Sequence, residues 1–237
     1  MSLPKIQYPI FELEVPSKNI SLKFRPFLVK EEKLLLIAQQ SGEIKEIVLA
    51  LKQIINNCCV DLDTAFDMEL LTLFDVEFLF LKLRSKSVNN MVNINITDRE
   101  DEKEYKLSID LEDVKLVHNP EHSNIIDINN MKIKLRYPKV DMLDQIQRMA
   151  IDVEMFFDVM KYCFEDIEFE GAKFNFSDYS DKEVKEFIEQ LNVEGFNKIS
   201  KFFETMPKMY YEIKYTNSLD KEQTIVLETL ADFFTLA

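Results

Sequence analysis

The fold is decided by residues 21–38, which read SLKFRPFLVKEEKLLLIA. Up to Phe24 apolar and polar residues alternate, as in a half-buried strand, and from Lys30 charged residues lead into a dense apolar run of helical length. Pro26 marks the change, because proline has no N–H for a strand ladder and pushes Arg25 toward extended backbone. The sequence therefore predicts a strand that turns directly into a helix.

The neighbouring segments extend this prediction in both directions. Residues 5–15 and 20–24 alternate in polarity on either side of turn chemistry at 16–19, which predicts a β-hairpin. The helix over about 30–40 is expected to end before Ser41-Gly42, and a second helix over about 43–58 carries an apolar stripe at i, i+3, i+4 spacing. These helices are predicted to form an αα-hairpin.

Further along the chain, helical and strand patterns alternate in blocks. Thr72 with Asp75, and Ser180 with Glu183, have the form of capping boxes that open helices. Apolar residues that alternate with polar ones (period 2) predict the strands, and apolar residues that recur with a period of 3.6 predict the remaining helices. Strands are expected near 92–96, 105–109, 126–128, 131–137, 209–215 and 224–227, and helices near 140–150, 153–164 and 197–205.

These patterns predict an α+β fold with helical N- and C-terminal parts, antiparallel hairpins and a central, mainly β segment. Residues 1–88 are expected to hold a hairpin and helices, residues 89–138 the central antiparallel segment, and residues 139–237 a helical region that ends in a hairpin. The length of 237 residues, with 46% hydrophobic residues, suffices for one large domain or two small ones.

Composition narrows the functional classes. With 29 basic and 43 acidic residues the net charge is −14, which disfavours nucleic acid as the main partner. The longest apolar runs are far shorter than the ~20 residues that cross a bilayer, and the N-terminus does not have the pattern of a secretory signal. We therefore expect a protein of the cytoplasm, or of a particle assembled there.

Cysteine and glycine usage excludes several kinds of site. Adjacent Cys58 and Cys59 with distant Cys163 are not a disulfide framework, and we interpret them as buried structural thiols. The glycines stand alone at positions 42, 171 and 195. Phosphate loops and nucleophile elbows need several glycines close together, so enzymes of these types are not expected.

Three clusters could carry chemistry. His118, Glu121 and His122 match the H-x-x-E-H zincin pattern, but that pattern works only on a helix, whereas Pro120 lies between the histidines and the flanks predict strands. A stretch with acidic residues at 61, 63, 67 and 69 lacks the glycine of a calcium loop, and we interpret it as a solvated acidic loop. The acidic cluster at 165–170 alternates with apolar residues, which favours an edge strand. No cofactor or metal is expected.

Four blocks of sequence are distinctive: KFRPFLVKEEK at residues 23–33, which is the most specific, LRSKS at 83–87, KLRYP at 134–138 and LADFF at 230–234. Together they resemble a known family, the baseplate hub and hub-assembly proteins of T-even-like contractile-tailed bacteriophages. The resemblance implies a non-enzymatic structural component of the tail baseplate hub. It leaves open a transient hub assembly factor that is absent from the finished virion.

A protein of this kind is expected to act through surface complementarity with other baseplate and tail proteins, and homo-oligomers are possible. No nucleic acid, membrane or small-molecule substrate is expected. The chain would be in the host cytoplasm during assembly and in the virion tail baseplate if it is a permanent subunit. Phe24, Arg25, Pro26 and Phe27 are the candidate interaction residues, because arginine among aromatics is typical of interface hot spots, although both phenylalanines also fit core packing. The rival hypothesis is a zinc-dependent hydrolase that uses the histidine pair.

Overall fold

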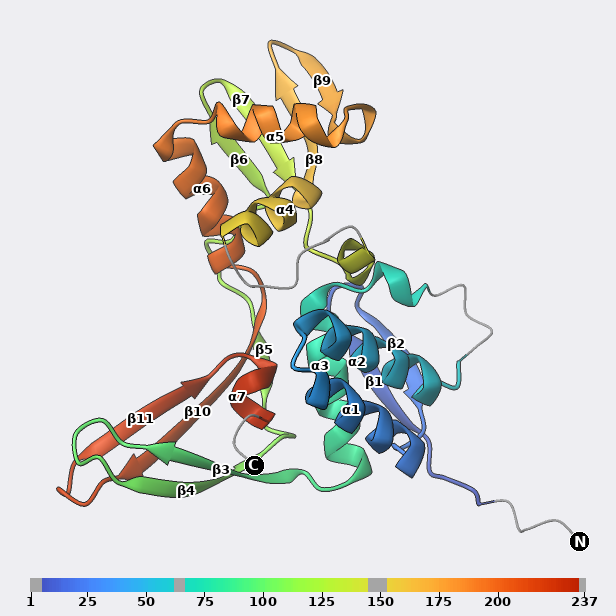
Figure 1. The fold of residues 1–237 in the computed structure, drawn as a ribbon, viewed down its shortest axis with the longest axis vertical. Helices are drawn as coiled ribbons and strands as arrows, with labels where there is room; N and C mark the ends of the chain where they lie inside the picture. The colour runs from blue at the N-terminus through green and yellow to red at the C-terminus, as the bar shows by residue number, and fades with distance from the viewer. Residues whose placement is uncertain (1–5, 62–66, 145–152, 235–237) are drawn as a thin grey trace, which may run out of the picture. The chain divides into compact units, whose positions relative to one another are not determined.

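A computed structural model describes residues 6–61, 67–144 and 153–234, and it shows an α+β protein (Figure 1). The chain divides into two compact units. Unit 1 comprises residues 1–117 and 208–237, and unit 2 comprises residues 118–207. The predicted fold class is confirmed. The division at residues 88 and 138 stays a prediction, because it groups residues by secondary structure whereas the units are defined by contacts.

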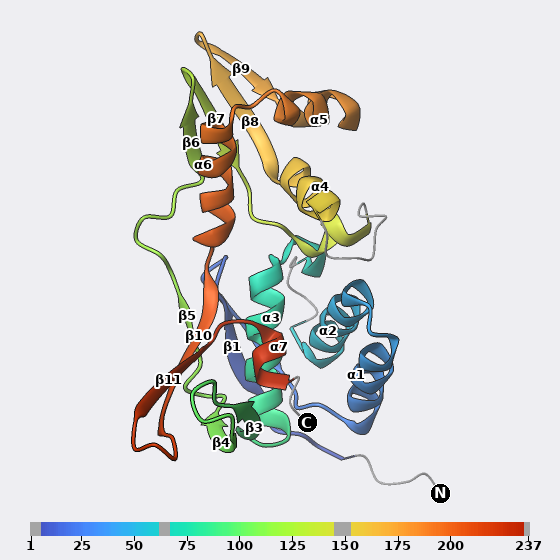
Figure 2. The same cartoon turned by 60° about the vertical axis from the view of Figure 1, so that its left-hand side comes forward.

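Unit 1 combines helices with short antiparallel sheets. In chain order its elements are β1 (Phe11–Val15), β2 (Ile20–Phe24), α1 (Val29–Ser41), α2 (Ile44–Cys58), η1 (Met68–Leu70), α3 (Leu73–Ser87), β3 (Met91–Thr97), β4 (Glu104–Asp110), β5 (Lys115–Val117), β10 (Lys208–Thr216), β11 (Glu222–Leu227) and α7 (Leu230–Phe234). β1 pairs with β2, and the αα-hairpin of α1 and α2 follows, with the two helices side by side in Figure 2. The strand that leads into a helix is confirmed.

Local sequence signals set the helix ends as expected. Gly42 ends α1 in the left-handed region, at φ 70°, where its N–H reaches the Gln39 carbonyl. Thr72 and Asp75 form the predicted capping box of α3, each side chain accepting from the other's backbone N–H. In both cases the residues involved are three positions apart, so the sequence pattern predicts the helix end directly.

The pairing of β10 was not visible in the sequence. β10 lies between β11 and β5 and is antiparallel to each, so the C-terminal hairpin belongs to the same sheet as a strand from the first half of the chain. A core cluster joins this sheet to the β3–β4 hairpin, to α3 and to α7. Its buried side chains are Leu81, Ile94, Ile109, Leu111, Val114, Met209, Ile213, Leu227 and Phe233. The last strands of the chain thus complete both the sheet and the core of unit 1.

Lys82 of α3 fixes the loop between β4 and β5. Its Nζ donates to the carbonyl oxygens of Leu111, Glu112 and Val114, at 3.2, 2.7 and 2.7 Å. Nζ also lies 5.3 Å from the centroid of the Phe78 ring. One lysine therefore donates to three carbonyls of this loop.

We expect Lys82→Met to lower the free energy of unfolding by about 1–2 kcal/mol, because three charge-assisted hydrogen bonds are lost while the apolar stem remains. The control is Lys86→Met, one turn further along α3. Lys86 pairs with the Glu112 carboxylate at 2.7 Å, but both side chains are more than 40% exposed (43% and 46%), so its loss should cost less than about 1 kcal/mol. Urea unfolding of both variants measures the difference, and equal effects would contradict the role of the carbonyl contacts.

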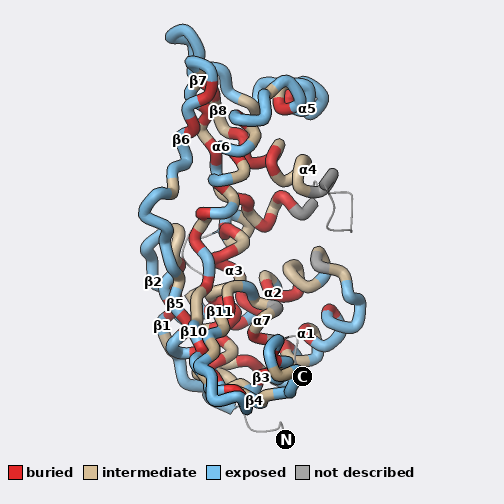
Figure 3. The backbone as a smooth tube through the Cα atoms, turned by 90° about the vertical axis from the view of Figure 1, so that its left-hand side faces the viewer, coloured by how far each residue is buried: buried red, intermediate tan, exposed pale blue. Residues whose placement is uncertain are grey.

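Unit 2 is a four-stranded antiparallel sheet with helices packed against it. Its elements are β6 (Ile125–Ile128), β7 (Met131–Leu135), η2 (Val140–Asp144), α4 (Val153–Cys163), β8 (Phe164–Phe169), β9 (Ala172–Asn175), η3 (Phe176–Asp178), α5 (Asp181–Glu189) and α6 (Val193–Glu204). The strand order is β6-β7-β8-β9. A separate core forms between the sheet and α4, α5 and α6, and Figure 3 shows buried residues within each unit.

Three predictions for unit 2 can be compared with the structure: a turn, an edge strand and a helix. Asn129 and Asn130 both have positive φ, at 47° and 64°, and form the predicted turn between β6 and β7. β8 is not an edge strand as predicted, since it pairs with β7 and with β9. Alternation reveals which face of a strand is buried, but it does not reveal how many neighbours the strand has. Of the helix predicted over 140–150, residues 140–144 are a 3₁₀ helix and the rest lie outside the described residues.

Candidate functional site

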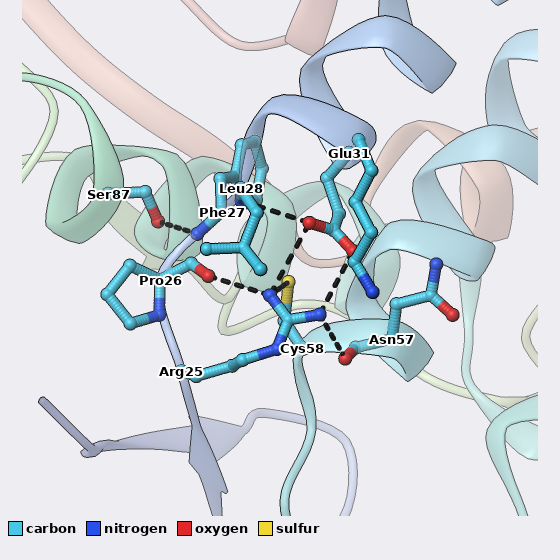
Figure 4. A network of polar contacts seen from close by, with 9 residues as sticks. Arg25, Pro26, Phe27, Leu28, Glu31, Asn57, Cys58 and Ser87 are labelled. Atoms are coloured by element: carbon cyan, nitrogen blue, oxygen red, sulfur yellow. Dashed lines mark hydrogen bonds and ion pairs between the residues drawn. The ribbon is translucent and has the colours of Figure 1, made fainter. Parts of the chain in front are cut away.

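The predicted interaction residues lie where β2 ends and α1 begins, and Arg25 makes an ion pair there. Its Nη2 lies 3.0 Å from Glu31 Oε1, and its Nη1 lies 3.4 Å from Oε2 (Figure 4). The Glu31 side chain has no exposed surface, and that of Arg25 is 16% exposed. The arginine of the deciding stretch is therefore paired with an acidic neighbour inside the molecule.

Arg25 also caps the end of α2. Its Nη2 donates to the Asn57 carbonyl at 2.7 Å, and its Nη1 donates to the Pro26 carbonyl at 2.9 Å and lies 3.6 Å from Cys58 Sγ. The backbone reinforces this contact, because the Arg25 N–H donates to the Cys58 carbonyl at 2.8 Å. Arg25 thus satisfies two carbonyls at the C-terminus of α2, one through its guanidinium and one through its backbone N–H, and the helix dipole favours a positive charge there.

The aromatic residues on either side of Pro26 are part of the core. Phe24 is fully buried and Phe27 is 9% exposed. The Phe27 ring lies 5.6 Å from that of Phe80 on α3, and its N–H donates to Ser87 Oγ at 2.9 Å. We call Arg25, Glu31, Asn57, Cys58 and Ser87 the helix junction, because together they join β2 to α1, α2 and α3.

The charges of the helix junction stabilise one another. Burial raises the pKa of the Glu31 carboxyl, but hydrogen bonds from Arg25 and from the Leu28 N–H outweigh it, so the pKa lies below its usual value. Burial raises the pKa of the Cys58 thiol to about 11 despite the adjacent guanidinium. Cys58, Cys59 and Cys163 are all buried and free, which confirms the interpretation as structural thiols. The Cys58 thiol therefore stays protonated near neutral pH.

The histidine pair does not form the zinc site of the rival hypothesis. Residues 118–122 form a turn, in which the His122 N–H donates to the Asn119 carbonyl at 3.0 Å, and not the helix that H-x-x-E-H requires. Glu121 instead pairs with Lys201 at 2.9 Å. His122 packs against the rings of Tyr137 and Phe202, its Nδ1 lies 2.9 Å from Thr205 Oγ1, and burial lowers its pKa. His122 is therefore a packing residue of unit 2.

Comparison with known proteins identifies the family. The model of the family described as T4 bacteriophage base plate protein matches residues 8–235, which is nearly the whole chain. The chain belongs to this family. No curated protein and no solved structure matched it. Membership confirms the phage baseplate family suggested by residues 23–33.

The block of sequence that carried the resemblance builds the helix junction. Within the base plate protein chain, Phe24 and Phe27 fill the core and Arg25 pairs with Glu31, so these residues organise the fold of unit 1. A further role of Phe24, Arg25, Pro26 and Phe27 in contacts with partners stays a prediction.

The other acidic clusters of the base plate protein have local partners. Asp61 accepts from the Lys23 N–H at 2.7 Å, Asp67 caps η1 and Glu69 pairs with Lys52, while Asp63 lies outside the described residues. Within the described part of the chain, no group of three or more His, Cys, Asp or Glu side chains is placed to hold a metal ion. Over the same residues, no helix is long and apolar enough to span a bilayer.

A groove in unit 2 is a candidate functional feature that sequence reasoning missed. It lies between the β8–β9 hairpin and α5, with a volume of about 350 Å³. Its lining is dominated by large apolar side chains, among them Met131, Phe169, Phe174, Phe176, Tyr179 and Phe187. Phe169, Phe174 and Tyr179 are 37%, 39% and 43% exposed. The sequence signal was present in the density of aromatics over 164–187, but which rings face solvent depends on how α5 packs.

The floor of the groove is an ordered aromatic cluster. The Phe176 ring lies 4.9 Å from that of Phe164 and 5.5 Å from that of Phe187, with edge-to-face or tilted geometry. The lining also includes the acidic side chain of Glu183, in the first turn of α5. An apolar hollow with a carboxylate among its lining residues is suited to bind a bulky apolar segment that carries positive charge.

Proposed function

We propose that this base plate protein is a structural component of the baseplate hub and acts by protein–protein interaction rather than by catalysis. Family membership supports a baseplate role. The observation that carries the proposal is the groove of unit 2, where partly exposed aromatic rings form a surface typical of protein interfaces. The residue clusters that could have carried chemistry serve packing and capping instead, which supports a non-enzymatic function.

A transient assembly factor is the alternative, since it too would need specific apolar surfaces. The two roles differ in where the protein is found: a hub subunit remains in the finished virion, whereas an assembly factor is present in the host cytoplasm only while baseplates form. The expected partners in both cases are other baseplate and tail proteins, with neither nucleic acid nor membrane involved.

Quantitative mass spectrometry of purified finished particles and of baseplate intermediates tests the proposal. We expect the chain in both, at a constant ratio to the other baseplate proteins. A chain found in intermediates but lost from finished particles would identify an assembly factor. A chain found in neither would contradict both roles.

The groove can be tested in the same preparations. Phe174→Asp places a charge among the exposed rings of the groove, and it is expected to prevent incorporation while the purified variant remains folded. The matched control is Val193→Asp, at an apolar residue of α6 that is 76% exposed and does not line the groove. The control should be incorporated like the wild type.

A further inference from the structure

The groove of unit 2 has a complementary surface on helix α1 of unit 1. The side of α1 that faces the core carries Glu31, Leu35 and Ala38. At about 100° per residue, Val29, Lys33 and Leu36 lie on the opposite side. Val29, Leu36 and Ile37 are 87%, 51% and 55% exposed, so this helix is apolar on both sides. A helix with apolar residues all round is normally covered on all sides.

The outer face of α1 also differs in charge from the rest of the chain. Its exposed residues are Val29, Lys30, Lys33, Leu36, Ile37, Gln39, Gln40 and Ser41, and none is acidic. The chain as a whole has a net charge of −14. This outer face is therefore a positively charged, apolar surface on an acidic protein, and a partner for it must offer apolar contact together with negative charge.

The groove offers that combination. Its lining is apolar, and over residues 164–189, which build most of it, acidic residues outnumber lysines. The α5 lysines are engaged by their own helix, since Lys182 pairs with Glu186 and Lys185 with Glu189. Lys173 of β9 likewise pairs with Asp166, and the acidic residue that lines the groove itself is Glu183. An amphipathic helix that lays its apolar face into such a groove is a common mode of recognition.

We propose that the outer face of α1 in one copy of the chain docks into the groove of unit 2 in a second copy. The contact joins two different surfaces, so each bound copy still presents a free groove or a free α1 and can bind the next. Copies would associate head to tail, and they would form a ring if the rotations between successive copies add up to a full turn. The inference rests on the proposed function, for which it names a second copy as the occupant of the groove.

Sedimentation of the purified full-length chain over a range of concentrations tests the proposal without phage particles. The wild type is expected to associate as its concentration rises, and more weakly at high salt because opposite charges contribute. Leu36→Glu on α1 and Phe174→Asp in the groove should each weaken association by about 10- to 100-fold, the effect of losing one buried bulky side chain. Tyr179→Asp is a second groove variant in case Phe174→Asp disturbs β9.

The controls introduce the same charge at exposed apolar residues elsewhere. Val193→Asp in unit 2 and Leu219→Asp in unit 1, at positions 76% and 54% exposed, should associate like the wild type. Circular dichroism of each variant verifies that it is folded.

Mixing the two interface variants identifies the occupant. Leu36→Glu chains retain an intact groove and Phe174→Asp chains retain an intact α1, so the mixture should form heterodimers and nothing larger. A wild type that stays monomeric at all concentrations would overturn the proposal. So would folded variants that associate normally, or a mixture that stays monomeric. A groove that binds another baseplate protein but no second copy would also overturn it, while leaving the hub function intact.

Discussion

Glu31→Ala is expected to lower the free energy of unfolding of unit 1 by about 3–5 kcal/mol, because it leaves the Arg25 guanidinium largely buried without its counter-ion. Glu31 accepts from Arg25 Nη2 at 3.0 Å and from the Leu28 N–H at 2.9 Å. Its loss would therefore leave a charge and a backbone donor unsatisfied at the start of α1. Since Arg25 also holds the end of α2, both helices should loosen together.

The thiols give this prediction a local readout. Cys58 and Cys59 lie at the end of α2 and Cys163 lies in unit 2, and all three are buried. Alkylation followed by peptide mass spectrometry should show faster labelling of Cys58 and Cys59 in Glu31→Ala, with Cys163 unchanged. Urea unfolding gives the total loss of stability. Lys30→Ala is the control, since Lys30 is 64% exposed and its removal should cost less than about 1 kcal/mol.

The same pair predicts a dependence of stability on pH. The pKa of Glu31 is lower in the folded chain than its usual value, so the unfolded chain takes up the proton more readily. The stabilisation is therefore present above the unfolded pKa of about 4.3 and is lost as the pH falls through the folded pKa. The stability difference between the wild type and Glu31→Gln should shrink below about pH 4. A difference that stays constant into acid would contradict the assignment.

The helix junction shows what sequence reasoning could and could not provide. The change from strand to helix at Pro26 was predictable, because proline and polarity patterns act over a few residues. The burial of Glu31 was not, since a run of Lys-Glu-Glu-Lys fits the solvated first turn of a helix as well. Burial depends on Arg25 and on the end of α2, which the chain brings together only when it folds. Arginine among aromatics suggested an interaction role for residues 24–27, whereas core packing of Phe24 and Phe27 was the other interpretation, and the structure shows both rings in the core.

The short range of sequence patterns also explains the other differences between the predictions and the structure. Capping residues at 42, 72 and 180 and the Asn129-Asn130 turn were readable, because each acts on its immediate neighbours. The pairing of β10 with β5, and the interior position of β8, depend on partners that are distant in sequence or on the order of strands in a sheet. The groove depends on how α5 lies against the β8–β9 hairpin. Long-range packing thus determines the candidate functional surface, and local patterns cannot specify it.

Asp75→Ala is expected to lower the free energy of unfolding by about 2–4 kcal/mol, since it removes the acceptor of several buried or half-buried donors at once. Asp75 is fully buried at the start of α3. Its carboxylate accepts from the N–H and hydroxyl of Thr72, at 2.9 and 2.6 Å, and from the N–H and hydroxyl of Ser17, at 2.9 and 2.6 Å. One carboxylate thus caps α3 and also holds the turn of the β1–β2 hairpin against it.

Hydrogen exchange of the Ser17 amide distinguishes the second role from ordinary capping. In Asp75→Ala this amide should exchange much faster than in the wild type, because its acceptor is gone even where α3 remains helical. Asp67→Ala is the matched control, since Asp67 caps η1 by accepting from the Glu69 N–H at 2.9 Å but is itself exposed, so its loss should cost less than about 1 kcal/mol. Equal losses of stability for Asp75→Ala and Asp67→Ala would contradict the role of Asp75 in holding the hairpin against α3. An unchanged Ser17 amide would show that the turn is held by β1 and β2 alone.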